Sequence, residues 1–184
     1  MRFFLSAIIY FQVTISMAQT SPEMRFRKIR DEVLQGAEVR SFISTRDGLL
    51  WFGSNKGLAS FDGNEMMYYG NKGLATGANY RVTDLCEDYL GNLWIISPEL
   101  GIVFFNRKSG LFKRIEIPIN EKIQSPKIQF VKIYIDRQGI ILIGTWNRGF
   151  FTYDPQTKVS HHFNLNPAKA AEWENRYQNS VRNI

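Results

Sequence analysis

The side chains in this sequence that are best suited to chemistry are an adjacent histidine pair, four tryptophans and a set of recurring aspartates. His161 and His162 are neighbours in a segment that reads as a strand, so their imidazoles point to opposite faces and cannot easily share a metal ion. Neither has a cysteine or carboxylate partner at ligand spacing. We therefore expect no metal site and no cofactor.

The aspartates Asp47, Asp62, Asp136 and Asp154 recur at equivalent predicted turns, where an Asp side chain accepts hydrogen bonds from nearby backbone amides. A catalytic pair would be unique within a chain, so this recurrence indicates a structural role. The sequence also contains no Ser/His/Asp set, phosphate-binding loop or Cys-x-x-Cys motif. We expect no catalytic residue and no enzymatic activity in this chain.

The tryptophans divide into two groups. Trp51 and Trp94 occupy mid-strand positions, which favours burial in a core over a sugar-stacking role. Trp146 lies in a predicted loop with Arg148, and these two side chains are our weak candidates for ligand contact, with an ordinary loop role as the alternative. The same alternative applies to Trp173, which lies in another predicted loop.

The elements that must position these residues recur three times along the chain. Each copy reads as a glycine turn, an apolar strand, a second turn and a returning strand. The recurring positions are Gly48, Trp51, Gly53, Gly57, Phe61 and Asp62, then Gly91, Trp94, Gly101 and Phe105, then Asp136, Gly139, Leu142, Gly144, Gly149, Tyr153 and Asp154. Such self-similarity is the signature of a repeat architecture.

Each repeat extends to four predicted antiparallel strands, over about residues 39–70, 82–117 and 130–163. The same opening pattern begins at Val39, Val82 and Phe130, and it returns near residue 181, where we expect a fourth unit to begin. Within the units we expect strands at 39–45, 49–53, 58–61 and 65–69, at 82–87, 93–96, 102–105 and 112–117, and at 130–135, 140–145, 150–153 and 159–163.

Units of about 40 to 50 residues with four antiparallel strands are the blades of a β-propeller. The predicted fold class is therefore all-β, an incomplete propeller over 39–184 with three blades and the start of a fourth. Propellers close with about four to eight blades. We therefore expect the first and third blades to expose apolar outer faces, which lowers stability and invites aggregation or self-pairing.

The N-terminus predicts export. Residues 1–18 combine a positive start, an apolar run and a small-residue cleavage site after Ala18, which is typical of a signal peptide. The apolar run is shorter than a membrane span needs, so a retained anchor is the weaker alternative and no span remains after cleavage. We expect a periplasmic protein with a polar lead-in at 19–38, a short strand at 26–29 and a short helix at 168–173.

Composition excludes further classes. The chain is 44% hydrophobic with a formal charge of +6, but Lys and Arg are scattered rather than clustered, so we expect no nucleic-acid partner. Cys86 is the only cysteine and stands in an apolar strand pattern, so it forms no internal disulfide and is expected to be packed rather than reactive.

The first copy of the repeat, Gly-x-Leu-Trp-Phe-Gly-Ser followed by Gly-Leu-x-x-Phe-Asp, resembles the two-component regulator propeller repeat. The resemblance covers nearly all of 39–184, although Ile96 replaces a glycine in the second copy and Leu142 replaces the Trp in the third. It implies the N-terminal part of the periplasmic ligand sensor of a hybrid histidine kinase, with an oligosaccharide as the ligand. The implied partners are further propeller blades and downstream kinase modules, which this sequence does not contain, so no kinase activity is expected.

Two other functions compete with this one. An exported propeller enzyme of the polysaccharide lyase or lactonase type would need a His, Arg or metal constellation near the central channel, and neither histidine has suitable neighbours. A passive interaction scaffold is the third hypothesis, and only the identification of partners would distinguish it.

Overall fold

The computed structural model describes residues 36–70, 72–74, 80–119, 128–146 and 148–164. Contacts within the chain separate Met1–Arg30 from Asp31–Ile184, and every described residue belongs to the second unit. Several predicted features lie outside the described residues: the signal peptide at 1–18, most of the lead-in at 19–38, the strand at 26–29, the helix at 168–173, Trp173 and the fourth unit near 181.

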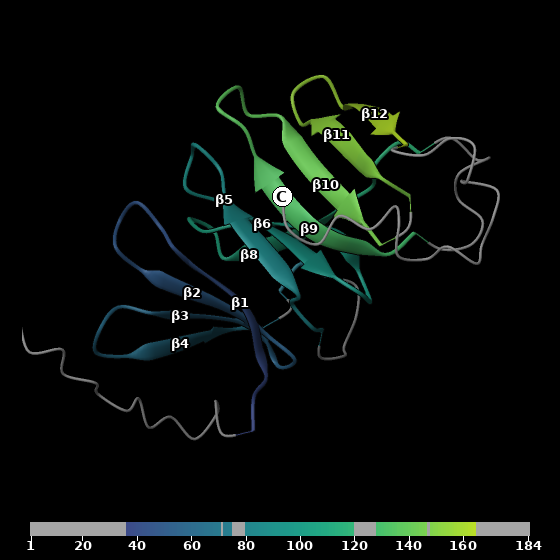
Figure 1. Ribbon diagram of the computed structural model, residues 1–184. Coiled ribbons are helices and arrows are strands. Elements are labelled where there is room, and N and C mark those ends of the chain that lie inside the picture. Colours follow the sequence, from purple (N-terminus) through teal and green to yellow (C-terminus); the bar gives the residue numbers. More distant parts are fainter. Residues whose placement is uncertain (1–35, 71, 75–79, 120–127, 147, 165–184) are drawn as a thin grey trace, which may run out of the picture. The chain divides into compact units, whose positions relative to one another are not determined.

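The described residues form three four-stranded antiparallel sheets, each with its strands in sequence order, as Figure 1 shows. We call them blade 1, blade 2 and blade 3. Blade 1 contains β1 (Val39–Ser44), β2 (Leu50–Ser54), β3 (Gly57–Phe61) and β4 (Met66–Tyr69). Blade 2 contains β5 (Asp84–Glu87), β6 (Leu93–Ser97), β7 (Gly101–Asn106) and β8 (Leu111–Ile115). Blade 3 contains β9 (Phe130–Ile135), β10 (Ile141–Thr145), β11 (Phe150–Asp154) and β12 (Val159–Phe163).

These sheets confirm the predicted all-β class and incomplete propeller for the described residues. Most strand bounds fall within one residue of the prediction, but β5 begins two residues later and β8 ends two residues earlier than predicted. The paired residues of β5 begin at Asp84. The Thr83 amide still donates to the Ile96 carbonyl of β6, at 2.9 Å, but the Val82 amide donates to the Ser54 carbonyl of blade 1, at 2.9 Å. No helix among the described residues is long and apolar enough to cross a membrane.

The hairpin between the first two strands of each blade has the same construction. Gly48, Gly91 and Gly139 have φ angles of +84°, +79° and +85°, a conformation that glycine adopts without steric cost. Each of these glycines donates its amide to the carbonyl three residues earlier, at 2.8 to 3.1 Å. The repeated glycine therefore sets the same turn in all three blades.

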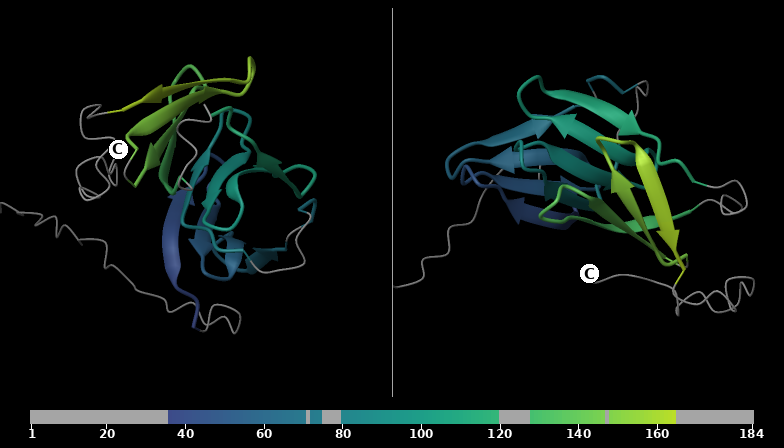
Figure 2. Two further views of the ribbon diagram at one scale, coloured as in Figure 1. Left: turned by 90° about the vertical axis from the view of Figure 1, so that its right-hand side faces the viewer. Right: turned by 90° about the horizontal axis from the view of Figure 1, so that it is seen from above.

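Neighbouring blades contact each other through their first strands, β1 with β5 and β5 with β9. We call the side of a blade that carries Trp51, Trp94 or Leu142 its leading face, and the opposite side its trailing face. Residues that pair across the ladder lie on one side of a sheet, which assigns every strand residue to one of these faces. Figure 2 shows the strands of each blade from two further directions.

Two hydrophobic cores lie between the blades. In the first, Trp51 and Leu58 of the leading face of blade 1 pack with Val103 of the trailing face of blade 2. In the second, Trp94 of the leading face of blade 2 packs with Phe151 of the trailing face of blade 3. Every residue of β6 is buried, and its two faces pack in different cores: Leu93 and Ile95 in the first, Trp94 and Ile96 in the second.

The trailing face of blade 1 and the leading face of blade 3 carry exposed apolar side chains. Phe42 is 70% exposed on blade 1, and Tyr134 and Phe163 of blade 3 are 50% and 46% exposed. These exposures agree with the expectation that the two outer faces present apolar strands.

Candidate functional site

The loop between β10 and β11 carries Trp146 and Arg148, the two predicted candidates for ligand contact. Both residues are half-buried. The Trp146 amide donates to the Gln129 carbonyl at 3.0 Å, and the Arg148 amide donates to the Thr145 hydroxyl at 2.9 Å. His162 donates from Nε2 to the Arg148 carbonyl at 2.6 Å. The backbone of the loop is therefore held on both sides by blade 3 and the segment before it.

A hollow of about 780 Å³ lies between blades 2 and 3 beside this loop. Gln129, which accepts the Trp146 amide, also lines the hollow. Its other lining residues include the apolar side chains of Ile119 and Phe130 and the charged side chain of Arg114. An apolar wall with a few polar groups is the usual composition of a small-molecule site. Neither Trp146 nor Arg148 is among the residues that line this hollow, so the predicted loop is linked to it through the hydrogen bond from the Trp146 amide to Gln129.

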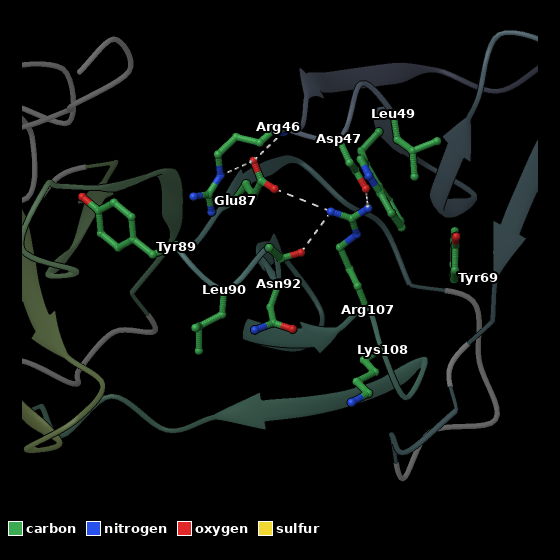
Figure 3. A pocket seen from close by; sticks show the side chains of 12 residues that line it. Arg46, Asp47, Leu49, Tyr69, Glu87, Tyr89, Leu90, Asn92, Arg107 and Lys108 are labelled. Carbon is green, nitrogen blue, oxygen red and sulfur yellow. Dashed lines mark hydrogen bonds and ion pairs between the residues drawn. The ribbon is translucent and has the colours of Figure 1, made fainter.

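A second hollow of about 640 Å³ lies between blades 1 and 2 and is lined by their turns (Figure 3). Arg107, whose side chain is only 17% exposed, extends across it. Its Nη1 lies 3.5 Å from Glu87 Oε1 and donates to the Gly91 carbonyl at 3.1 Å, while its Nη2 pairs with Asp47. The guanidinium also stacks over the Trp51 ring, 5.0 Å from the ring centre.

Arg46 completes this arrangement from blade 1. Its Nε lies 3.6 Å from Glu87 Oε2, and its amide donates to the same oxygen at 3.1 Å. The guanidinium lies 5.9 Å from the centre of the Tyr89 ring. We call Arg46, Asp47, Glu87 and Arg107 the turn latch, because their alternating charges join the hairpin turns of blades 1 and 2. These charges pair with one another across the second hollow. We therefore interpret this hollow as part of the contact between blades 1 and 2 rather than as a binding site.

Sequence reasoning missed the turn latch, since its members are far apart along the chain; Asp47 and Arg107, for example, are separated by 60 residues. The Thr45 hydroxyl, followed by the Arg107 guanidinium, holds the pKa of the Asp47 carboxyl below its usual value. A lowered folded-state pKa stabilises the fold above the unfolded pKa, and this contribution is lost as the pH falls through the folded value.

We expect Arg107→Ala to lower the free energy of unfolding by about 1–3 kcal/mol, because it leaves Glu87 partly buried with a weaker partner. The matched control is Lys108→Ala, an exposed residue that lines the same hollow, with an expected change below about 0.5 kcal/mol. Urea unfolding of both variants measures the difference. Asp47→Asn should cost less, since Asp47 is half-exposed, and its deficit should shrink below pH 4. A deficit that grows in acid would contradict the assigned role of Asp47.

A third polar cluster lies on the inner strands. Asp84 of β5 is buried and accepts hydrogen bonds from the Ser41 hydroxyl of β1, at 3.0 Å, and from the Ile133 amide of β9, at 2.8 Å. Lys132 of β9 pairs with the same carboxylate at 3.3 Å. One carboxylate therefore ties all three blades together. Its strand position carries no turn signal, so Asp84 could not be identified from the sequence as a functional or structural candidate.

The remaining candidates are the histidine pair and Cys86, and their contacts among the described residues are structural. His161 is exposed while His162 stacks on the Phe151 ring at 4.5 Å, so the pair points to opposite faces. No group of three or more His, Cys, Asp or Glu residues within the described part of the chain could hold a metal ion. Cys86 is half-buried beside the second core, and burial raises the pKa of its thiol.

The recurring motif residues occupy equivalent places in the three blades. Trp51 and Trp94 are buried, whereas Leu142 is half-buried. Asp62 and Asp136 each accept backbone amides of their own turns through Oδ1, at 2.7 to 2.9 Å, and Asp154 accepts the Gln156 amide at 2.8 Å. The other motif positions lie in turns or in the blade faces: Gly57, Gly101 and Gly149 with positive φ, and Gly53, Gly144, Phe61, Phe105 and Tyr153 buried.

No family model matches this chain, and no curated protein matches it. Solved structures do share its fold. The extracellular domain of the putative hybrid two-component system BT3049 from B. thetaiotaomicron is 20% identical over 70% of this chain, with a TM-score of 0.55. The extracellular domain of the putative one-component system BT4673 from the same organism is 20% identical over 79% of this chain, with a TM-score of 0.54.

A third similar structure is an enzyme, a catalytically inactive virginiamycin B lyase from Staphylococcus aureus with quinupristin. It is 15% identical over 71% of this chain, matches 42% of the lyase and has a TM-score of 0.55. This chain spans only 18% of the length of the two B. thetaiotaomicron domains. The resemblance to two-component regulator propellers is thus confirmed at the level of the fold: the blades described here share the fold of the extracellular domains of these two putative systems.

Proposed function

We propose that this chain supplies blades to an exported, ligand-sensing β-propeller of a hybrid two-component regulator. The observation that carries the proposal is the fold shared with two extracellular domains of putative bacterial signalling systems. The Gly-x-Leu-Trp-Phe-Gly-Ser motif of the first blade supports it independently, since it resembles the repeat of such regulators. Export to the periplasm by a signal peptide cut after Ala18 is part of the proposal.

The ligand we propose is an oligosaccharide, bound beside the loop that carries Trp146 and Arg148. The hollow next to this loop is large enough for a small ligand and combines an apolar wall with a few polar groups. Indole and guanidinium groups suit a sugar, because the ring stacks on its apolar face and the cation donates to its hydroxyls. The partners we propose for the intact sensor are further blades and the kinase modules that transmit the signal.

The test is a thermal-unfolding screen of the purified chain against a panel of oligosaccharides from common polysaccharides. A ligand that binds only the folded state stabilises it by about 2.7 kcal/mol at a hundredfold excess over Kd, so the midpoint temperature should rise by several degrees. The double variant with Trp146→Ala and Arg148→Ala should lose this rise. Leu90→Ala, at a turn residue that is 87% exposed, should retain it.

Two results would contradict the proposal. A panel without a single binder argues against oligosaccharide sensing by these blades. A sugar that binds and is consumed, with new products seen by chromatography, would instead favour a propeller enzyme, the class to which the virginiamycin B lyase belongs. A sugar that binds unchanged, and whose binding is lost in the double variant, is the expected outcome.

A further inference from the structure

The hollow between blades 2 and 3 is lined by polar side chains of two kinds, those that are bonded within the protein and those that are not. The lining residues with a polar side chain are Thr83, Ser97, Glu99, Arg114 and Gln129. A polar group that is already satisfied gains little from a ligand, whereas an unbonded one at the wall can bind it. The unbonded groups therefore indicate which ligand the hollow suits.

The two hydroxyl groups are used within blade 2. The Thr83 hydroxyl donates to the Ile96 carbonyl at 3.3 Å, and the Ser97 hydroxyl donates to the Glu99 carboxylate at 3.1 Å. The Ser97 hydroxyl also accepts the Leu100 amide, at 3.4 Å. These hydroxyls hold the turn between β6 and β7 and are not left for a ligand.

Glu99 is satisfied as well. Its Oε1 accepts a hydrogen bond from Arg81 Nε at 2.5 Å, and its Oε2 accepts the Arg81 amide at 3.1 Å. Burial raises the pKa of the Glu99 carboxyl, but the hydrogen bonds from Arg81 outweigh burial and hold the pKa below its usual value. The carboxylate is therefore ionised at neutral pH, and the Arg81 guanidinium balances its charge.

Arg114 and Gln129 are the unbonded groups. Both residues are exposed, and Arg114 lies one residue before the end of β8. Within the described residues, Arg114 forms no ion pair, not even with the exposed Glu116 two positions further on. Gln129 gives its backbone carbonyl to the Trp146 amide, but its side-chain amide has no hydrogen-bond partner in the described part of the chain. The hollow therefore offers a guanidinium and an amide to a ligand.

These two groups stand beside an apolar wall. Ile119, Phe130 and Val131 line the same hollow and are half-buried. A planar guanidinium matches a carboxylate with two parallel hydrogen bonds, and it does so better than any other side chain. A glutamine amide both donates to and accepts from hydroxyl groups. An apolar surface, and Phe130 above all, suits the C–H face of a sugar ring.

We propose that this hollow binds an acidic oligosaccharide, with the carboxylate of a uronic acid on the Arg114 guanidinium and neighbouring sugar hydroxyls on the Gln129 amide. The sugar ring lies against the apolar wall that includes Phe130. This inference rests on the proposed function, which it narrows from oligosaccharides in general to those that carry a carboxylate.

Isothermal titration calorimetry of the purified full chain with matched pairs of oligosaccharides tests the proposal. One pair is an oligogalacturonate and its carboxyl-reduced, neutral counterpart, and the other is a xylo-oligosaccharide with and without a glucuronic acid branch. We expect the acidic member of at least one pair to bind at least about tenfold more tightly than the neutral member. A higher salt concentration should weaken only the acidic member.

Variants of neighbouring residues identify the contact. Arg114→Gln should raise the Kd of the acidic member at least about tenfold and leave that of the neutral member unchanged. Arg114→Lys should have an intermediate effect, because it keeps the charge and loses the two parallel hydrogen bonds. The matched control is Lys113→Gln, which removes the same charge from an exposed residue of β8 that does not line the hollow. It should change the Kd by less than about twofold.

The outcomes separate this inference from the proposed function. Neutral members that bind as tightly as the acidic ones would overturn the inference and leave oligosaccharide sensing intact. Equal effects of Arg114→Gln and Lys113→Gln would also overturn it, because they would show general attraction of anions by a basic protein. An equal response to acetate would overturn it for the same reason. If no member of either pair binds, the inference and the proposed oligosaccharide ligand both fail.

Discussion

Replacing Phe105 with alanine is expected to lower the free energy of unfolding by about 3–5 kcal/mol. Phe105 is fully buried in the first core, and its ring lies 4.4 Å from that of Phe112, 5.1 Å from that of Tyr69 and 5.8 Å from that of Trp51. Alanine at this position removes the ring that joins both blades and leaves a cavity between them. Urea unfolding followed by tryptophan fluorescence measures the loss.

The control for this prediction is Leu90→Ala, since Leu90 is 87% exposed and contributes little to the core. Its expected effect is within about 0.5 kcal/mol of zero. A loss of less than about 1 kcal/mol for Phe105→Ala would mean that blades 1 and 2 do not share the core described here.

Substituting Gly149 with alanine is expected to be nearly as damaging, for a different reason. Gly149 has a φ of +68°, and a Cβ at this position would lie 2.1 Å from the Phe163 carbonyl oxygen of β12. The alanine therefore combines backbone strain of about 1–2 kcal/mol with a steric clash of similar size. We expect a total loss of about 3 kcal/mol, measured by urea unfolding.

Gly101→Ala is the matched control. Gly101 begins β7 with a φ of +80°, but no heavy atom outside its own chain neighbours lies within 4 Å of a Cβ at this position. Its alanine variant carries the strain without the clash, so we expect a loss of about 1–2 kcal/mol. Equal losses for Gly101→Ala and Gly149→Ala would show that β12 does not approach the turn as described.

The strands and turns of this fold were predictable from sequence because each is a local pattern that repeats three times. The glycine turn at Gly48 recurs at Gly91 and Gly139, and each copy fixes the register of the two strands beside it. Three copies in register also predict the blade architecture without any knowledge of contacts between strands. A single copy would have predicted only a hairpin.

The contacts between blades were not predictable in the same way. Arg107 reads as an ordinary basic turn residue, and only the fold brings it to Asp47 and over the Trp51 ring. Asp84 likewise reads as a polar residue on a strand, yet it binds Ser41 and Ile133 of two other blades. Long-range polar contacts of this kind leave no periodic signal in the sequence. They depend on how the blades pack together and not on any local sequence pattern.

Functional residues were the least predictable part. Trp146 and Arg148 are candidates because an aromatic and a cation share one loop, and the Trp146 amide is hydrogen-bonded to Gln129, which lines a hollow that neither candidate itself lines. The side chains that line that hollow come from blade 2, blade 3 and the segment before β9. No single stretch of sequence contains them together, so the candidate site depends on the arrangement of the blades.

The stacking of the described blades requires that, in this chain, blade 2 is covered on two sides while blades 1 and 3 are each covered on one. Amide hydrogen exchange of the purified chain tests this arrangement most directly. The second strands β2, β6 and β10 are each hydrogen-bonded on both edges, so they differ mainly in the covering of their faces. All residues of β6 are buried, whereas β2 and β10 include half-buried ones. We expect amides of β6 to exchange about tenfold more slowly than those of β2 and β10, since stability is highest where a strand is buried on both faces. Equal exchange in the three strands, or slower exchange in β2 or β10, would contradict the stacking of the blades.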